Sequence, residues 1–385
     1  MAITSSGQVT LSDIYDEFTG THSSQEIQLS DYHGSGNAPS SGEIQLATDF
    51  DGTSAGDWKG SRAFYFGGWY YSSSGSGLGS DHIQYKTMTT DGDMGDFGDL
   101  SISDVSHFLG SGSNGTRVLR GGGIPSQGAP SVWATARETI DYWTAASTVN
   151  ASDAGDLEVP GEKGGASGAS NGTLCLFIKY DIQYQNIFST GGATDGGGGL
   201  YGGADSKRHE ASNGDTYTLI CGINSNSYGA TDDAIHQHNF STTANATEFG
   251  GVVKVGVGGG TGLCSSTTRV IFGGGWVDSS YSRSDEIHYL TIASPSDSTD
   301  AMDLAQDLSD LAATSDGTRG EFYGGRAPNP GYIQNDIMKV TIASLSGTAS
   351  IIGDLANEDS GTSGGSYTET GGIFNGGAQT AIVAE

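Results

Sequence analysis

Short apolar runs recur along the chain, each inside the same polar frame. A small polar turn and a Thr-Arg or Ser-Arg pair precede the run, and two glycines follow at five and six residues after the arginine. The clearest copies begin at Arg62, Arg117, Arg269 and Arg319. Apolar runs of this length between turn residues predict β-strands, and a spacing of about fifty residues predicts a repeat architecture.

Weaker copies keep the same phase as these four. Asn171-Gly172-Thr173-Leu174 begins one of them, and another ends in Gly376-Gly377 near the end of the chain. Seven anchors at this spacing predict seven repeat units, and the anchors are Arg62, Arg117, Leu174, Thr216, Arg269, Arg319 and Gly371.

Each unit is predicted to hold four strands. A tight turn such as Asn171-Gly172 or Asp316-Gly317 joins the first two, because these dipeptides accept the positive φ angles of hairpin turns. The third strand is expected around an isoleucine and the fourth around the leucine of a Gly-Asp-Leu element. The residues are Ile83, Ile140, Ile187, Ile235, Ile287 and Ile337 for the third strands, and Leu100, Leu157, Leu200, Leu304 and Leu355 for the fourth.

Four antiparallel strands per repeat with a double glycine after the second resemble the kelch-type β-propeller over residues 41–385. The resemblance implies an all-β, seven-bladed propeller. The last copy lacks a fourth strand, and residues 43–46 stand alone, so we expect 43–46 to complete blade seven with 362–385. Joining the ends in this way would remove a free sheet edge. The alternative is an open β-solenoid of similar repeats.

Charge and composition exclude several classes of function. The net charge is −29 with only 16 Lys and Arg, so we expect no nucleic-acid binding, which needs clustered cations. No apolar run is long enough for a membrane helix, and residues 1–15 lack the pattern of a secretory leader. We therefore expect no membrane insertion, and export by another route such as a particle released on lysis. Cys175, Cys221 and Cys264 are expected to be buried thiols.

Residues 1–40 differ from the repeats. Residues 8–18 predict a small strand and then a helix capped by Ser12 or Asp13, and residues 33–40 predict a linker. The Leu-Ser-Asp segment ending in Glu-Phe, followed by a second Leu-Ser-Asp-Tyr, resembles the N-terminal modules of virion fibre and appendage proteins of marine tailed phages. The resemblance implies attachment to other virion proteins through apolar residues of this module, namely Leu11, Ile14, Tyr15, Phe18, Leu29 and Tyr32.

No catalytic motif is present in the sequence, so no enzyme activity and no cofactor are expected. His236 and His238 are expected on one strand face, where they could bind a metal, or else lie at the surface or between blades. The acidic residues offer no pair that sequence alone identifies as a glycosidase site. Candidate calcium ligands, or else solvated charges, are Asp232, Asp233, Asp303, Asp307 and Asp310.

The connections between second and third strands carry aromatic residues amid Ser, Asn and Gly. They are expected to emerge on one face of the propeller, where rings can stack on sugars and small polar groups can bind hydroxyls. The alternative is that the rings pack between blades. The residues expected to bind glycan are Trp69, Tyr70, Tyr71, Trp133, Tyr228, Trp276, Tyr281 and Tyr332.

These features together predict a phage virion structural protein, which would be a tail fibre, a knob or a capsid-surface appendage. Its expected location is the virion, in several copies, and its expected partner is carbohydrate on the host surface. Two alternatives stay open at this point. One is a purely architectural neck, collar or decoration protein, and the other is a polysaccharide depolymerase.

Overall fold

A computed structural model describes most of the chain from Arg62 to Ala356. The described residues are 62–71, 77–102, 107–114, 117–124, 138–145, 148–158, 167–178, 181–199, 210–211, 217–221, 234–252, 261–266, 268–275, 282–294, 296–309, 311–328 and 334–356. Within these ranges the regular elements are all β-strands, as predicted.

The strands are short and follow one another in repeating groups along the chain. Their bounds are β1 Arg62–Phe66, β2 Trp69–Tyr71, β3 Gly77–Gly79, β4 His82–Thr87, β5 Gly95–Asp99, β6 His107–Ser113, β7 Arg117–Ile124, β8 Thr139–Thr144, β9 Ser152–Asp156, β10 Ser167–Ser170, β11 Leu174–Ile178, β12 Asp181–Asn186, β13 Thr194–Gly199, β14 Glu210–Ala211, β15 Tyr217–Cys221, β16 Ala234–Asn239, β17 Thr247–Val252, β18 Gly262–Ser265, β19 Arg269–Gly273, β20 Ser284–Thr291, β21 Thr299–Leu308, β22 Ala312–Ser315, β23 Arg319–Tyr323, β24 Asp336–Thr341 and β25 Ser350–Asp354.

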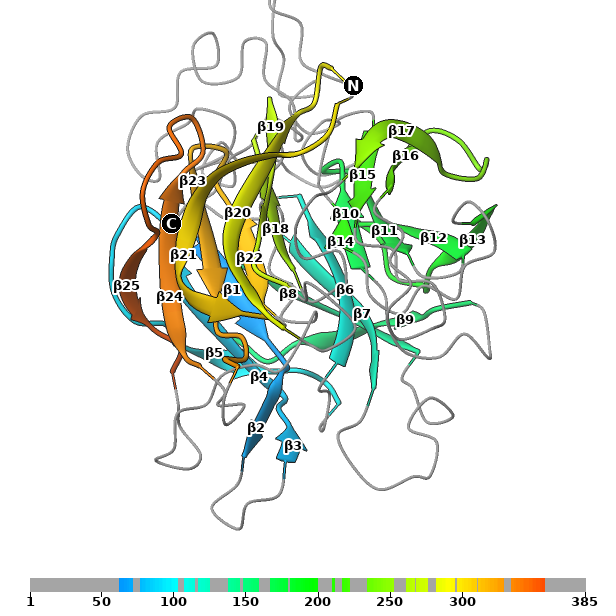
Figure 1. Ribbon diagram of the computed structural model, residues 1–385. Coiled ribbons are helices and arrows are strands. Elements are labelled where there is room, and N and C mark those ends of the chain that lie inside the picture. The colour runs from blue at the N-terminus through cyan, green and yellow to red at the C-terminus, as the bar shows by residue number, and fades with distance from the viewer. Residues whose placement is uncertain are drawn as a thin grey trace, which may run out of the picture.

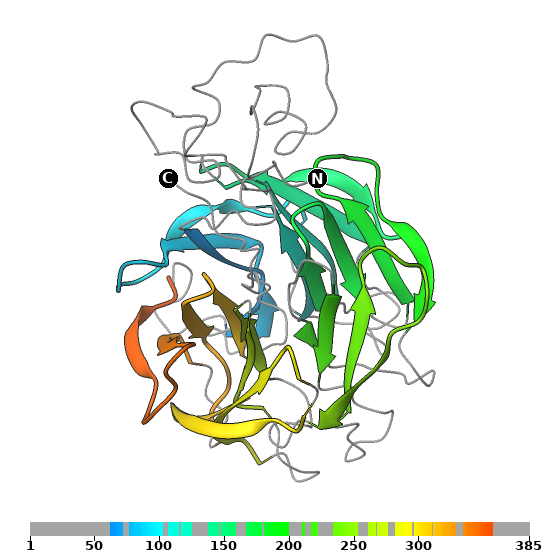
Figure 2. The ribbon, with the colours of Figure 1, turned by 90° about the horizontal axis from the view of Figure 1, so that it is seen from above.

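The sheets are arranged radially as the blades of a β-propeller (Figure 2). Blade 1 contains β1, β4 and β5, and the other five blades are the four-stranded meanders β6–β9, β10–β13, β14–β17, β18–β21 and β22–β25. The first strands of neighbouring blades lie beside one another, for example β6 against β10 and β18 against β22, so they are the inner strands. The radial arrangement excludes the open solenoid.

The prediction of seven blades is wrong, because the described sheets form a ring of six in which blade 6 packs directly on blade 1. In blades 2, 3 and 6, the residue directly before the fourth strand donates its backbone N–H to the carbonyl of an aspartate in the preceding blade. These bonds run from Ala151 to Asp99, from Ala193 to Asp156 and from Ala349 to Asp303.

Blade 1 makes the same bond to blade 6. Met94 donates its N–H to the carbonyl of Asp354 at 2.9 Å, and Gly353 lies so close to the backbone of Gly92 that a Cβ would overlap it. A seventh blade would have to separate these atoms. The seventh anchor, Gly371, and the expected closing strands at 43–46 and 362–385 lie outside the described residues, as does the N-terminal module 1–40.

The turn between first and second strands explains the polar residue that begins each repeat. Asn171 donates its N–H to the carbonyl of Leu174, and its side-chain oxygen accepts the N–H of Leu174 at 2.8 Å. Asn114, Ser266 and Asp316 each make the same two hydrogen bonds with the residue three positions later in the chain. The polar residue is thus the first of four turn residues and caps the next strand, rather than occupying a central position of the turn.

The glycine pair opens the connection to the third strand. Gly67 and Gly68 have φ angles of 64° and 96°, and the equivalent pairs in blades 2, 5 and 6 are also left-handed. Gly67 still donates its N–H to the carbonyl of His82, and the carbonyl of Gly68 still accepts the N–H of Ser80. The pair therefore redirects the chain while the base of the connection stays hydrogen-bonded, which a residue with a side chain would do only under strain.

The repeated arginine braces one blade against the next. The guanidinium of Arg62 lies over the ring of Tyr85 in its own blade, 4.8 Å from the centroid, and donates to the carbonyl of Ala145 in blade 2. Arg269 repeats this with Tyr289 and with the carbonyl of Ile342 in blade 6. The stacking is a cation–π contact, and the bond crosses the seam between blades.

The predicted strand positions are mostly confirmed. The isoleucines of blades 1, 2, 4, 5 and 6 lie in the third strands, but Ile187 follows β12, and Ile182 takes the position because it pairs with Ile178. Leu100 and Leu355 directly follow the fourth strands and are buried, whereas Leu200 lies outside the described residues. Cys175 and Cys264 are buried free thiols, as predicted, and burial raises the pKa of each.

Candidate functional site

The connection between the second and third strands of blade 1 carries three of the aromatic residues singled out in the sequence. In blade 1 this connection forms a hairpin of its own, in which Trp69 pairs with Gly79 and Tyr71 with Gly77. The hairpin β2–β3 projects beyond the sheets (Figure 1, bottom). It is rooted at the glycine pair on one side and at Ser80 on the other, so a rigid blade carries it.

Three of the predicted glycan-binding residues lie in the described part of the chain. Trp69, Tyr70 and Tyr71 are consecutive residues of β2. The other five lie outside the described residues and stay predictions, namely Trp133, Tyr228, Trp276, Tyr281 and Tyr332. The predicted attachment residues Leu11, Ile14, Tyr15, Phe18, Leu29 and Tyr32 also lie outside them.

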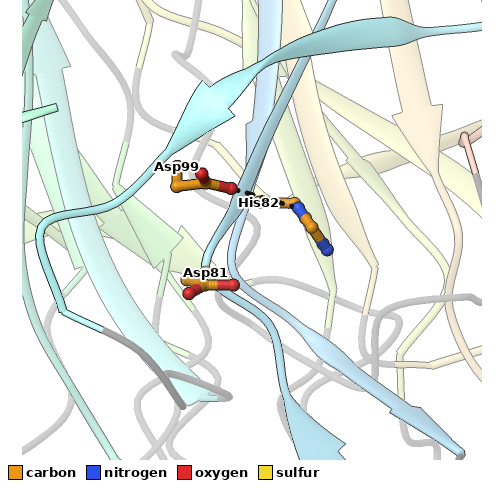
Figure 3. A group of neighbouring side chains, drawn as sticks. All are labelled: Asp81, His82 and Asp99. Atoms are coloured by element: carbon orange, nitrogen blue, oxygen red, sulfur yellow. Dashed lines mark ion pairs between the residues drawn. The ribbon is translucent and has the colours of Figure 1, made fainter. Parts of the chain in front are cut away.

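A group of three titratable side chains lies at the base of the hairpin. Asp81 lies between the hairpin and β4, His82 is the first residue of β4, and Asp99 ends β5 opposite His82. One donor atom from each of the three lies within 4.8 Å of the others, and Nδ1 of His82 is 3.3 Å from Oδ1 of Asp99. Figure 3 shows the two carboxylates and the imidazole around one small space. The side chains of His82 and Asp99 are 29% and 45% exposed, so solvent reaches the group.

Backbone hydrogen bonds hold this group in place. The carbonyl of Asp81 accepts the N–H of Leu100 at 2.7 Å, and the carbonyl of His82 accepts that of Gly67. Asp99 is held from blade 2, because its N–H donates to Oδ1 of Asn150 and its carbonyl accepts the N–H of Ala151. The three side chains therefore project from a fixed frame at the seam of blades 1 and 2.

The equivalent positions in other blades hold different chemistry. In blade 6 they are Asn335, Asp336 and Asp354, and burial followed by the nearby Asp354 charge raises the pKa of Asp336. The amide of Gln306 donates to Asp336 at 3.1 Å. In blade 2 the positions hold Glu138, Thr139 and Asp156. Neither of these two sets contains an imidazole.

Sequence reasoning missed the group at the base of the hairpin. Its members are at most 18 residues apart in the chain, from Asp81 to Asp99, but they meet only because Ile83 pairs with Gly98. The signal was present, since His82 precedes a predicted third-strand isoleucine and Asp99 precedes a predicted fourth-strand leucine. Aligning the predicted third and fourth strands on this isoleucine and this leucine would have placed His82 opposite Asp99.

The histidines singled out in the sequence are buried in blade 4. His236 and His238 are 2% and 4% exposed on β16. Burial lowers the pKa of His238, which favours its neutral form. Among the aspartates considered for calcium, Asp303 and Asp307 are exposed on β21, and Asp232, Asp233 and Asp310 lie outside the described residues.

Comparison of the sequence with known proteins does not assign the chain to a family. No model of a protein family matches the chain, and the curated proteins searched contain no significant match. In the part of the chain that the structure describes, no helix has the length and apolar character to span a membrane. Arguments about function therefore depend on the propeller and on the groups displayed at its face.

Proposed function

We propose that this protein is a structural protein of a phage virion that displays its propeller for adhesion to glycans on the host surface. The observation that carries the adhesion is the hairpin β2–β3, which places Trp69, Tyr70 and Tyr71 on one projecting element of a rigid ring. Three aromatic residues therefore lie next to one another in the backbone of this element. Such rings bind sugars by stacking, at a low cost in conformational entropy.

The location on a virion is supported by the sequence of residues 1–40, which resembles the attachment modules of phage fibre proteins. An acidic chain with a net charge of −29 suits exposure on a particle, because like charges oppose aggregation. In this proposal the N-terminal module docks on other virion proteins, and the hairpin face is turned outward to the host.

The test is binding of the full chain to an array of bacterial surface glycans. We expect the triple variant Trp69→Ala, Tyr70→Ala, Tyr71→Ala to lose at least about tenfold in affinity, since buried aromatic anchors contribute more than about 1–2 kcal/mol each. Tyr217→Ala is the matched control, because Tyr217 is 48% exposed at the start of β15, the opposite end of a second strand. Equal binding by the triple variant and wild type would contradict adhesion through the hairpin.

Two other outcomes would identify the rival functions. A map of the particle in which virion proteins cover the hairpin would favour an architectural neck, collar or decoration protein. Release of reducing ends from a host polysaccharide would favour a depolymerase. The same map, labelled at residues 1–40, tests the docking of the N-terminal module directly.

A further inference from the structure

We propose that Asp81, His82 and Asp99 form a binding site for a divalent cation of the zinc class at the base of the hairpin. The spacing of the donors supports this. The 3.3 Å between Nδ1 of His82 and Oδ1 of Asp99 is the separation of two neighbouring ligands in a tetrahedral site with metal–ligand bonds of about 2.0–2.1 Å. The Asp81 carboxylate completes a group whose donor atoms all lie within 4.8 Å.

The types of donor select the kind of metal. Calcium takes about 6–8 oxygen ligands, and this group supplies a nitrogen and two carboxylates. Imidazole favours zinc and the neighbouring transition metals. Three protein ligands leave at least one position of a tetrahedral site open for water or for an oxygen of a bound molecule.

The charge of the group also favours a cation. Among the described residues, Asp99 pairs with His82, and neither Asp99 nor Asp81 faces a lysine or an arginine. Asp91 in the same blade is different, because Arg319 and Lys339 both bind it. With a neutral imidazole the group at the hairpin base carries two negative charges, which a dication would offset.

The site is also held ready before any ion arrives. Bonds from Leu100, Gly67 and Ala151 fix the backbone of its three members. Ligands fixed in this way lose little conformational freedom on binding. Since Ser80 and Asp81 connect the hairpin to β4, a metal here would tie the root of the hairpin to the outer strand β5.

Metal titration of the full chain, free of affinity tag and treated with chelator, tests the proposal apart from any glycan. We expect one zinc ion to bind in calorimetry, and cobalt to give the visible absorption of a site with a nitrogen ligand. His82→Gln and Asp99→Asn should each weaken zinc binding at least about tenfold. Calcium should bind more weakly than zinc.

Two controls make the result specific. His288→Gln removes a histidine that lies 3.2 Å from the Glu286 carboxylate but belongs to no group of three donors among the described residues. Asp156→Asn removes the exposed aspartate equivalent to Asp99 in blade 2. Both should bind zinc as wild type does, and melting of the metal-free variants by circular dichroism checks their folding.

Three results would overturn the proposal. The first is absence of zinc binding by the wild-type chain. The second is undiminished binding by folded His82→Gln and Asp99→Asn proteins. The third is tighter binding of calcium than of zinc. None of these results depends on whether the aromatic hairpin binds glycan, so the failure of one proposal is distinguishable from the failure of the other.

Discussion

The seam between blades 1 and 2 and the seam between blades 6 and 1 have the same backbone geometry and opposite chemistry. Across the first, Phe64 contacts Trp143 edge to face, with ring centroids 5.9 Å apart. The registers of the strands make Glu321 and Lys86 the equivalent residues at the second, where Lys86 Nζ lies 3.0 Å from Glu321 Oε1. Both pairs are buried.

The seam between blades 6 and 1, called the charged seam below in contrast to the aromatic seam between blades 1 and 2, contains more than one ion pair. Arg319 binds the same Glu321 oxygen at 2.6 Å, and the hydroxyl of Tyr323 donates to the other oxygen at 2.5 Å. Asp91 joins Arg319 and Lys339 at the edge of the seam. Burying these charges is tolerated because each has partners, whereas the aromatic seam is stabilised by removing apolar surface from water. One repeat geometry thus accepts either solution when both sides of a seam change together.

The largest effect is expected from Glu321→Ala. This change leaves Lys86 buried without its carboxylate and removes the acceptor of Tyr323. The loss of one partner of a buried pair costs about 3–5 kcal/mol of the free energy of unfolding. Chemical denaturation measures it. A cost below about 1 kcal/mol would mean that the charged seam contributes little to closing the ring.

A smaller effect is expected from Phe64→Leu. Leucine keeps much of the apolar volume but loses the edge-to-face contacts with Trp143 and Phe97, each worth about 0.5–1.5 kcal/mol. The expected loss is roughly 1–3 kcal/mol in the same denaturation experiment, with no dependence on salt. If the loss in free energy of unfolding became smaller at high salt, the seam between blades 1 and 2 would also depend on charge, and the contrast between the two seams would fail.

The smallest effect is expected from Asp91→Asn, and it depends on pH. The hydrogen bond from Lys339 holds the pKa of Asp91 below its usual value, despite some opposing desolvation, and the charge of Arg319 lowers it further. Its contribution to stability is therefore present above the ordinary pKa of about 3.9 and is lost as pH falls through the lower folded value.

Melting temperatures between pH 5 and pH 2.5, an interval of about one to two units around that pKa, check this expectation. Wild type should fall more steeply than Asp91→Asn on acidification. Asp96→Asn is the control, because Asp96 is exposed in β5 of the same blade and makes no ion pair among the described residues. Parallel curves for wild type and Asp91→Asn would remove Asp91 from the charged seam.

The sequence predicted what short-range rules decide. The existence of tight turns at Asn171 and Asp316, the left-handed Gly67–Gly68 pair and most third-strand isoleucines follow from local backbone preferences, which a repeated pattern reveals. Even the error at Ile187 was local, because Ile182 competes for the same position five residues earlier.

The number of blades could not be obtained in the same way. The pattern at Gly371 resembles an anchor, but closure depends on Gly92 meeting Gly353 and on Lys86 meeting Glu321, more than 200 residues away. The group at the hairpin base was hidden for a related reason. Asp81 and His82 look ordinary until the register of β4 and β5 brings Asp99 beside them.

The glycine pairs also bear on how such a protein can change over generations. Because Gly67 and Gly68 keep the ladder closed beneath the outgoing chain, the residues beyond them can lengthen, shorten or mutate without disturbing the sheet. The same argument applies to the equivalent glycine pairs of blades 2, 5 and 6, so these four connections can vary independently of one another. Under selection, the sequence and length of these connections can therefore change while the sheets of the propeller stay the same.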